Sequence, residues 1–467
     1  MKNEKTAGQL LQEQLCEKPK NSYEIMSQED LQKAESFCED YKAFLDRAKT
    51  EREAVDSIIE MLKKEGYQEF ALGTKYAPGD KVYYNNRGKA LICATLGTEP
   101  LEQGVYIAAS HIDSPRLDLK PRPVYEDTEL ALFKTHYYGG IKKYQWTAIP
   151  LALHGVVIKR DGETVKVNIG EDEQDPIFCV TDLLPHLATE QSKRTLAEGV
   201  KGEELNILIG SRPFKDDKAS EKVKLNILSI LHEKYGMVES DFLSAELVLV
   251  PAFKAKDLGL DRSMIGAYGH DDRVCAYTSL MATLHCKAPK KTSVVIFADK
   301  EETGSEGNTG LDSRFLEYFI SDLAAPYGVE GRTVLQNSMC LSADVNVAFD
   351  PTFPDVVERR NTAYLNYGVV VTKYTGARGK SSTSDASAEF MGRVRSVLDQ
   401  AGVVWQTGEL GKVDFGGGGT VAKYIAGLSV DVVDVGVPVL SMHAPFEVVA
   451  KNDVYNTYRA FYEFLNQ

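Results

Sequence analysis

The chain has 467 residues, of which 43% are hydrophobic and 26% are charged, and its formal net charge is -14. This composition is typical of soluble globular proteins, and the length predicts two domains or one large domain with an insertion. The acidic balance argues against nucleic acid or anionic membrane as a partner, and no apolar run approaches the ~20 residues that span a bilayer. We therefore expect a cytoplasmic protein, with its seven scattered cysteines reduced.

The N-terminal part of the chain predicts two helices followed by strands. Residues 1–26 are polar and weakly patterned, which predicts a frayed tail or arm. Residues 27–48 carry one apolar stripe, and a second helix is expected directly after Thr50; both begin with the spacing of a capping box. From residue 67 to residue 106 the hydrophobic period shortens toward two, which predicts strands.

A histidine and an aspartate follow the short apolar run 105–109. Such a run predicts a buried strand, and His111 would stand at its carboxyl end. A lone histidine in that place is more often structural. Asp113, two residues later, can orient the imidazole ring of a metal-binding histidine, so we treat His111 as a candidate ligand.

Between about residues 119 and 249 the sequence changes character. Short β-rich segments alternate with turns and charged linkers, which predicts a β-rich inserted domain. The strand candidates are residues 151–159, 165–169 and 205–209.

Asp271 lies in a Gly-Ala-Tyr-Gly-His-Asp-Asp-Arg segment that precedes an apolar-periodic stretch from residue 274 to 284. The periodicity predicts a helix, and carboxylates at a helix N-terminus are often only caps. A carboxylate that bridges two cations would occupy the same position. The spacing alone leaves both interpretations of Asp271 open.

Glu301 and Glu302 follow the apolar run 292–297, and a helical region is expected to continue to about Phe319. Two adjacent carboxylates past a buried strand can divide their roles, one holding a metal and the other moving a proton. Taken alone, the pair is more often two solvated side chains.

Two further donors follow buried-strand candidates near the C-terminus. Asp344 comes after the run 339–343, and His443 comes after the run 437–442. The glycine-rich run before Thr420 lacks the signature of a phosphate loop and is expected to let the backbone approach a ligand. Helices are predicted over residues 384–401 and 453–465.

These donors together predict a metal centre. Two divalent ions ~3.5 to 4 Å apart need a bridging carboxylate and further histidine and carboxylate ligands, and mixed His and carboxylate donors without Cys favour zinc, with manganese or cobalt as substitutes. The chain offers the five ligands His111, Asp271, Glu302, Asp344 and His443, which leaves Glu301 as the base for a water between the metals.

At this point the sequence resembles the aspartyl aminopeptidase and vacuolar aminopeptidase I family of dinuclear zinc exopeptidases, from about residue 30 to the end. The resemblance rests on five motifs taken jointly, which are Ser110–Pro115, the Asp271 segment, Glu301–Ser305, Ser342–Asp344 and Ser441–His443. It implies a sheet-centred α/β catalytic domain, residues 1–117 and 252–467, interrupted by a β-rich dimerisation domain, residues 118–251.

The resemblance also implies how the ligands are shared. His111 and Asp344 would hold one zinc ion, Glu302 and His443 the other, and Asp271 would bridge the two ions.

The resemblance assigns roles around the metals as well. Glu301 would be the general base, and Asp113 would orient His111. His186, in Pro-His-Leu, would reach a neighbouring subunit's site, within a tetrahedral dodecamer built from dimers. Gly419 and Thr420 match an element near the substrate backbone. His270 is expected to be structural or to support the neighbouring ligand.

The implied activity is hydrolysis of the N-terminal residue from peptides, through a water that bridges two zinc ions. The Asp271 motif reads Asp-Asp where members that act on acidic substrates have Asp-Asn, so the preferred N-terminal residue is left open. Two other interpretations stay open: a dinuclear zinc amidohydrolase or carboxypeptidase acting on N-acylated amino acids or dipeptides, and a noncatalytic shell, which predicts damaged ligands.

Overall fold

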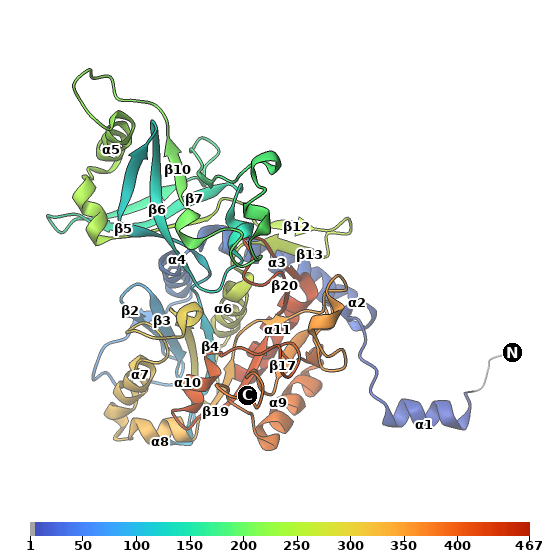
Figure 1. Cartoon of the computed structure of the whole chain (residues 1–467). Helices are drawn as coiled ribbons and strands as arrows, with labels where there is room; N and C mark the ends of the chain where they lie inside the picture. Colours follow the sequence, from blue (N-terminus) through green and yellow to red (C-terminus); the bar gives the residue numbers. More distant parts are fainter. Residues whose placement is uncertain (1–4) are drawn as a thin grey trace.

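The computed structural model describes residues 5–467 and has two lobes of unequal size (Figure 1). The larger lobe is built on a nine-stranded sheet of order β1-β2-β3-β14-β4-β15-β19-β17-β18. These strands are, in that order, Gln68–Glu69, Lys81–Asn86, Ala90–Thr95, Ser293–Ala298, Tyr106–His111, Met339–Ser342, Asp431–Gly436, Val369–Thr372 and Trp405–Thr407. The central strands β14, β4, β15 and β19 are parallel, so their carboxyl ends meet at one edge.

Helices cover both faces of this sheet, which confirms the predicted α/β class. Side chains of β4 alternate between the two cores: Tyr106 and Ala108 pack in one, Ile107 and Ala109 in the other. The first core is closed by α3 (Gln28–Arg47), α4 (Glu51–Lys64), α6 (His270–Leu284), α9 (Ala388–Ala401) and α11 (Lys451–Leu465). The second is closed by α7 (Phe315–Ala324), α8 (Gly331–Gln336) and α10 (Ala422–Ala426). Because the central strands are buried on both faces, most of their side chains are apolar.

The first two predicted helices of the large lobe are confirmed with their caps. The side chain of Ser27 accepts the backbone N–H of Asp30, and Thr50 forms a complete capping box with Glu53. The arm before them is helical in part, as α1 (Ala7–Leu15) and α2 (Ser22–Ile25), and α1 buries no residue. Figure 1 shows α1 projecting away from the lobe. The prediction for residues 1–4 lies outside the described part of the chain.

Two predicted helix starts are wrong. The stretch from Gly304 to Arg314 is not helical, and within it Gly304 and Gly307 adopt left-handed φ angles of 94° and 98°, which a right-handed helix does not accommodate. Helix α9 begins four residues after the predicted Ser384, since Ser387 is the residue whose side chain caps the helix through the N–H of Phe390.

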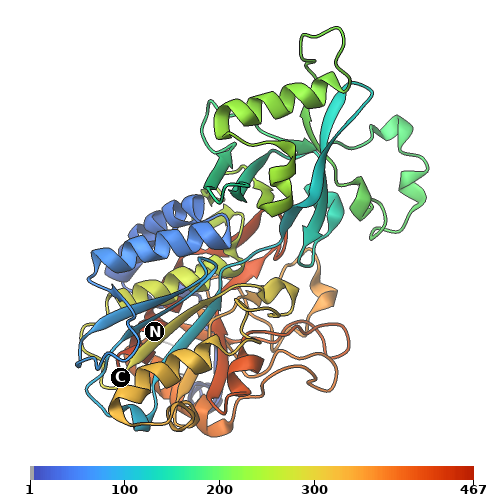
Figure 2. The same ribbon diagram turned by 90° about the vertical axis from the view of Figure 1, so that its left-hand side faces the viewer.

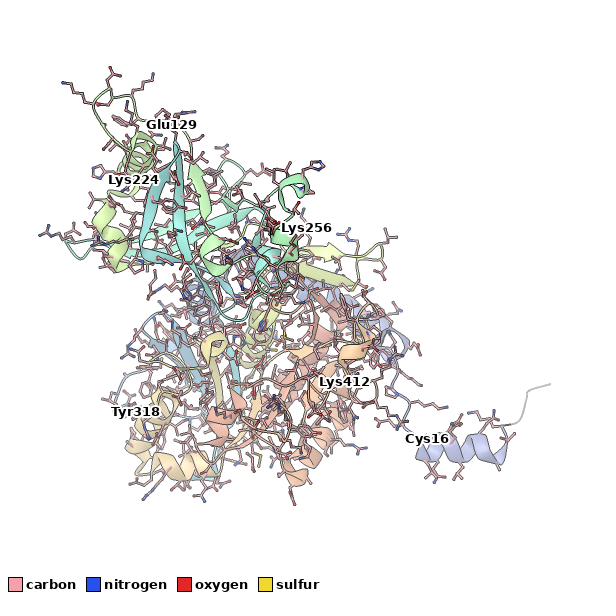
Figure 3. All side chains as sticks on the ribbon, viewed as in Figure 1. Cys16, Glu129, Lys224, Lys256, Tyr318 and Lys412 are labelled. Carbon is pink, nitrogen blue, oxygen red and sulfur yellow. The ribbon has the colours of Figure 1, made fainter. Side chains whose placement is uncertain are left out.

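The smaller lobe is built on a seven-stranded sheet of order β8-β7-β11-β5-β6-β10-β9. Its strands are β5 (Arg116–Asp127), β6 (Leu130–Tyr138), β7 (Leu151–Ile158), β8 (Thr164–Ile169), β9 (Cys179–Val180), β10 (Ile207–Gly210) and β11 (Ala245–Pro251). Helix α5 (Lys222–Tyr235), which the sequence analysis missed, packs Ile227 and Leu231 against this core. In Figure 3, Glu129 and Lys224 mark the distal end of this lobe, and Tyr318 and Lys412 lie on the larger one. The domain limits at 118 and 251 and the dimerisation role stay predictions.

A third, five-stranded sheet of order β12-β13-β21-β20-β16 supports the loops beside the central edge. Its strands are β12 (Lys256–Leu258), β13 (Met264–Ala267), β21 (Glu447–Ala450), β20 (Pro438–Leu440) and β16 (Asn346–Val347). Within residues 5–467, none of the helices combines the length and the hydropathy required to cross a bilayer.

Helix α4 and the residues just before it, drawn in blue below the smaller lobe in Figure 2, lie at the contact between the lobes. Charged side chains pair across this contact. His154 Nδ1 lies 2.7 Å from Glu53 Oε1, and Glu171 Oε1 lies 3.1 Å from both His154 Nε2 and Lys49 Nζ. Burial raises the pKa of Glu171, but the hydrogen bond from His154 and the charges of Lys49 and Lys254 outweigh it and hold that pKa at about 2.

This cluster predicts a stability loss in acid. A carboxylate with a pKa of about 2 in the folded chain and ~4.3 when unfolded stabilises the fold above pH ~4.3 and loses that contribution as the pH falls toward 2. The contribution should be about 2 kcal/mol after allowance for solvent screening. Thermal melts of the protein and its Glu171→Gln variant should differ at pH 6, and the difference should shrink steadily as the pH falls from about 4 toward 2. A difference that does not change with pH would contradict this assignment.

Candidate metal centre

Five predicted ligands come together at the carboxyl edge of the central strands. His111 ends β4, Glu302 lies in the short 3-10 helix η7 (Glu301–Thr303) after β14, and Asp344 lies two residues after β15. Asp271 is in the first turn of α6, and His443 follows β20. Within two groups the ligand atoms all lie within 4.8 Å of one another: His111, Asp272 and Asp344 form one, and Asp271, Glu302 and His443 form the other.

Asp271 lies between the two histidines. Its Oδ1 is 3.1 Å from His111 Nε2, and its Oδ2 is 3.2 Å from His443 Nε2. Asp344 Oδ1 lies 3.9 Å from His111 Nε2, and Glu302 Oε2 lies 3.5 Å from His443 Nε2. The two oxygens of one carboxylate therefore face two separate sets of donors, which is the geometry that a bridging ligand requires.

Both histidines present Nε2 to this cluster. His443 Nδ1–H donates to the carbonyl oxygen of Gly140 at 2.8 Å, and His111 Nδ1–H donates to the carbonyl oxygen of Asp113 at 3.1 Å. Because a carbonyl oxygen only accepts, Nδ1 carries a proton in each ring, so the neutral form that binds a metal has its lone pair on Nε2. His443 also has a left-handed φ of 64°, a strained conformation typical of functional sites.

Asp113 holds three of the neighbouring groups in place. Its Oδ1 lies 3.3 Å from His111 Nδ1 and accepts the N–H of Glu301 at 3.2 Å. Its Oδ2 accepts the N–H of Glu302 at 3.2 Å and the hydroxyl of Tyr138 at 2.7 Å. One buried carboxylate thus orients the histidine and fixes both glutamates.

Glu447 does the same for two more ligands, Asp271 and His443, and it was not predicted from the sequence. Its Oε1 accepts the backbone N–H of His443 at 2.7 Å, and its Oε2 accepts the backbone N–H of Asp271 at 3.0 Å. Asp272 was missed as well. It is fully buried, and its Oδ2 accepts the N–H of His111 at 3.4 Å. Neither contact has a signature in sequence spacing.

The electrostatics of the site fit bound cations. Burial together with the charge of Asp271 raises the pKa of Glu302 well above its usual range, and burial together with Glu301 does the same for Asp344. Burial also raises the pKa of Glu301 to about 7. Among the described residues, the buried Glu302 Oε1 has no hydrogen-bond partner. Crowded carboxylates, an unsatisfied oxygen and two imidazole Nε2 atoms are a donor set that suits zinc.

The other predicted site residues lie apart from this cluster. His186 is exposed on the 3-10 helix η3 (Pro185–Leu187), and within residues 5–467 it makes no hydrogen bond or ion pair with the site. Thr420 is buried and donates to Asp434 Oδ1 at 2.7 Å, and Gly419 precedes it. His270 is structural, as expected, since it contacts the hydroxyl of Tyr41 at 2.8 Å.

Glu447 should control metal affinity through the two backbones that it holds. Glu447→Ala removes both hydrogen bonds, so zinc affinity is expected to fall by about 10- to 100-fold. Competition with a chromogenic chelator would measure this.

Asp453 provides the matched control for this experiment. It is also fully buried and also accepts two backbone N–H groups, from Asn366 at 2.6 Å and Gly368 at 2.7 Å. Asp453→Ala should lower the melting temperature and leave zinc affinity unchanged. Equal zinc affinity in the protein and in Glu447→Ala would refute the positioning role.

Comparison with known proteins identifies the family. Residues 44–465 match the family model of the aminopeptidase I zinc metalloproteases (M18). A probable M18 family aminopeptidase 1 from Clostridium acetobutylicum is 50% identical, over 97% of this chain and 99% of its own. The crystal structure of an M18 aminopeptidase from Thermotoga maritima superimposes with a TM-score of 0.92 at 45% identity, over 96% of this chain and 99% of that one.

A more distant structure shares the fold alone. The mApe1 dodecamer of S. cerevisiae has a TM-score of 0.73 at 22% identity, over 91% of this chain and 95% of that chain. The family match and the close relatives confirm the resemblance found in the motifs. The chain belongs to the M18 family of zinc metalloproteases and is an aminopeptidase.

Proposed function

We propose that this aminopeptidase removes the N-terminal residue of peptides at a centre of two zinc ions per subunit, with manganese or cobalt as substitutes. His111 and Asp344 would hold one ion, Glu302 and His443 would hold the other, and Asp271 would contribute one oxygen to each. The observation that carries this proposal is the position of Asp271, whose two oxygens lie 3.1 and 3.2 Å from the Nε2 atoms of the two histidines.

When bound, the zinc ions supply Lewis acidity, which polarises the scissile carbonyl and lowers the pKa of a bound water. Glu301 is the general base. Its Oε2 lies 3.9 Å from His111 Nε2, at the edge of the ligand cluster, and its backbone is fixed by Asp113. Glu301 takes the proton from the water and delivers it to the leaving amine. Asp113 keeps the Nε2 lone pair of His111 directed into the site.

The family resemblance supports two further parts of this proposal. His186, exposed in this chain, reaches the site of a neighbouring subunit and steadies the oxyanion. Gly419 and Thr420 bind the substrate backbone. The role of His186 requires a homo-oligomer built from dimers, and a dodecamer is proposed by analogy with the dodecamer of the yeast protein. The cytoplasmic location stays a prediction from composition.

A matched pair of substrates tests the proposed reaction. The zinc-loaded protein should hydrolyse leucyl-alanine and leave N-acetyl-leucyl-alanine intact, because a blocked amine cannot bind the metals. Chelation should abolish the activity, and added zinc should restore it. Faster hydrolysis of N-acetylated amino acids would favour the amidohydrolase alternative. The loss of all hydrolysis in a metal-loaded protein would favour a noncatalytic assembly.

A further inference from the structure

One short segment of the smaller lobe contacts the proposed metal centre. This segment, Tyr138–Ile141, begins at the last residue of β6 and is here termed the strap. The hydroxyl of Tyr138 donates to Asp113 Oδ2 at 2.7 Å, and the carbonyl oxygen of Gly140 accepts Nδ1–H of His443 at 2.8 Å. Asp113 supports one of the two histidine ligands, and His443 is the other. The strap therefore contacts both halves of the centre.

The ring of Tyr138 is held by neighbouring cations. Tyr138 is buried, and it stands opposite Arg116 in the pairing of β5 with β6. The guanidinium carbon of Arg116 lies 4.1 Å from the ring centroid, and Arg116 Nη1 donates in turn to the buried Glu51 Oε2 at 2.9 Å. Lys300 Nζ lies 5.7 Å from the same centroid. The direction of the hydroxyl is thus set by packing before any metal binds.

Asp113 depends on this hydroxyl. The carboxylate is fully buried, and its contact with Tyr138 is the shortest that it makes, at 2.7 Å against 3.2 Å for the backbone N–H groups of Glu301 and Glu302. A short hydrogen bond from a hydroxyl to a carboxylate is stronger than one between neutral groups, and a buried carboxylate that loses a partner is strongly destabilised. Tyr138 therefore fixes the carboxylate that orients His111.

Gly139 brings the strap into contact with a third part of the centre. Its φ of 74° is left-handed, and a Cβ at this position would lie 3.2 Å from Glu302 Oε2 and 3.3 Å from Glu302 Cβ. Only a glycine lets the backbone pass this close to the ligand. The backbone of the strap consequently limits the space in which the Glu302 side chain can move.

The chain beyond the strap is anchored to the larger lobe as well. Trp146, the last residue of the 3-10 helix η2 (Lys143–Trp146), is fully buried and meets Tyr268 edge-on, with ring centroids 6.4 Å apart. The hydroxyl of Tyr268 donates to the carbonyl oxygen of Pro115 at 2.9 Å. Pro115 is two residues from Asp113, so both ends of the strap are tied to the same loop after β4.

We propose that Tyr138 is a positioning residue of the metal centre, and that through the strap the smaller lobe of each subunit supports zinc binding in that same subunit. The hydroxyl acts through Asp113 on His111, and Gly140 acts on His443. The inference rests on the proposed function, because it takes the five ligands to bind zinc. It goes further by giving the inserted lobe a role within its own subunit. Since such coupling is reciprocal, bound zinc should in turn hold the strap in place.

Tyr138→Phe tests this role in the full-length protein. The substitution keeps the ring against Arg116 and removes the hydroxyl. Zinc affinity, measured by competition with a chromogenic chelator, should fall by about 10-fold, the lower end of the range for residues behind a ligand, because the hydroxyl acts through Asp113. The visible absorption bands of the cobalt-loaded protein should also change, since these bands report the geometry of the ligands.

Tyr67→Phe is the matched control. Tyr67 is also buried, and its hydroxyl lies 2.8 Å from Thr95 Oγ1 and 3.2 Å from Thr283 Oγ1. Thr95 pairs with Ser293 at the start of β14, the end opposite the ligands. Tyr67→Phe should lower the melting temperature and leave the zinc affinity and the cobalt spectrum unchanged.

A second pair of variants tests the contact of the strap with Glu302. The added Cβ of Gly139→Ala must displace Glu302, so zinc affinity should fall by about 10-fold or more. Gly162→Ala is its control. Gly162 also has a left-handed φ, 87°, but within residues 5–467 an added Cβ would meet no atom within 4 Å apart from its chain neighbours. The control imposes similar backbone strain in the smaller lobe and should leave zinc affinity unchanged.

Hydrogen exchange of the unsubstituted protein provides a measurement that needs no variant. Zinc should slow the exchange of the strap amides relative to the metal-free protein, and this protection should be smaller in Gly139→Ala. Unchanged zinc affinity in a folded Tyr138→Phe variant, an equal loss in Tyr67→Phe, or strap exchange that does not respond to zinc would overturn the inference. The proposed function would stand in these cases, because the unsubstituted protein would still bind zinc and hydrolyse peptides. Failure of the unsubstituted protein to bind zinc would remove both.

Discussion

Replacement of Glu301 with Gln is expected to stop peptide hydrolysis while zinc remains bound. Gln has nearly the same shape and keeps the backbone hydrogen bond to Asp113, 3.2 Å in the structure. It cannot accept a proton from water. Since a positioned base contributes about 100- to 10,000-fold, kcat should fall by that factor. Metal affinity should change little, because Glu301 Oε2 lies 3.9 Å from His111 Nε2 and belongs to neither ligand group.

Steady-state assays and elemental analysis on the same purified sample would check this result. The zinc content per subunit should equal that of the unsubstituted protein, and the melting temperature should be preserved. Full activity in Glu301→Gln would show that another group is the base. Lost zinc would show that Glu301 is a ligand.

Glu302→Gln should have the opposite effect, although the residue is the next in the chain. Glu302 Oε2 lies 3.5 Å from His443 Nε2, and its buried Oε1 has no hydrogen-bond partner within residues 5–467. A neutral amide removes the negative charge that the proposed cation needs. Zinc affinity should fall by about 100-fold or more, beyond the effect typical of residues that only support a ligand.

Isothermal titration of the metal-free variant with zinc would measure this loss. Activity should be low at limiting zinc and recover in part at high zinc, which a variant in the general base would not do. Unchanged affinity in Glu302→Gln, with lost turnover, would mean that the two glutamates have exchanged roles. The Glu301→Gln and Glu302→Gln variants serve as controls for each other, since both exchange a carboxylate for an amide at neighbouring positions.

Local signals explain what could be predicted from the sequence. The capping boxes at Ser27 and Thr50 bond within one helical turn, so they are visible in the spacing of a few residues. The apolar runs before His111 and Glu302 predicted strands β4 and β14. The parallel pairing of these strands then brings their carboxyl ends to one edge. The predicted strands, together with their parallel order, explain why candidate ligands far apart in the sequence were predicted to lie close together.

Contacts between distant segments explain what was missed. Glu447 acts on the backbone of Asp271, and Asp272 acts on the backbone of His111, so neither contact depends on a local pattern. The start of α9 was misplaced because Ser384 and Ser387 are equally good caps in sequence, and only the structure selects Ser387. Helix α5 has a weakly amphipathic sequence between charged segments, and its packing against the smaller sheet identifies it.

The measurement that most directly tests the dinuclear centre is anomalous X-ray diffraction at the zinc edge from crystals of the zinc-loaded protein. Two zinc peaks per subunit are expected. One should lie beside His111 and Asp344 and the other beside Glu302 and His443, with Asp271 between them. A single peak in fully loaded and active crystals, or peaks away from these side chains, would contradict the proposed dinuclear centre.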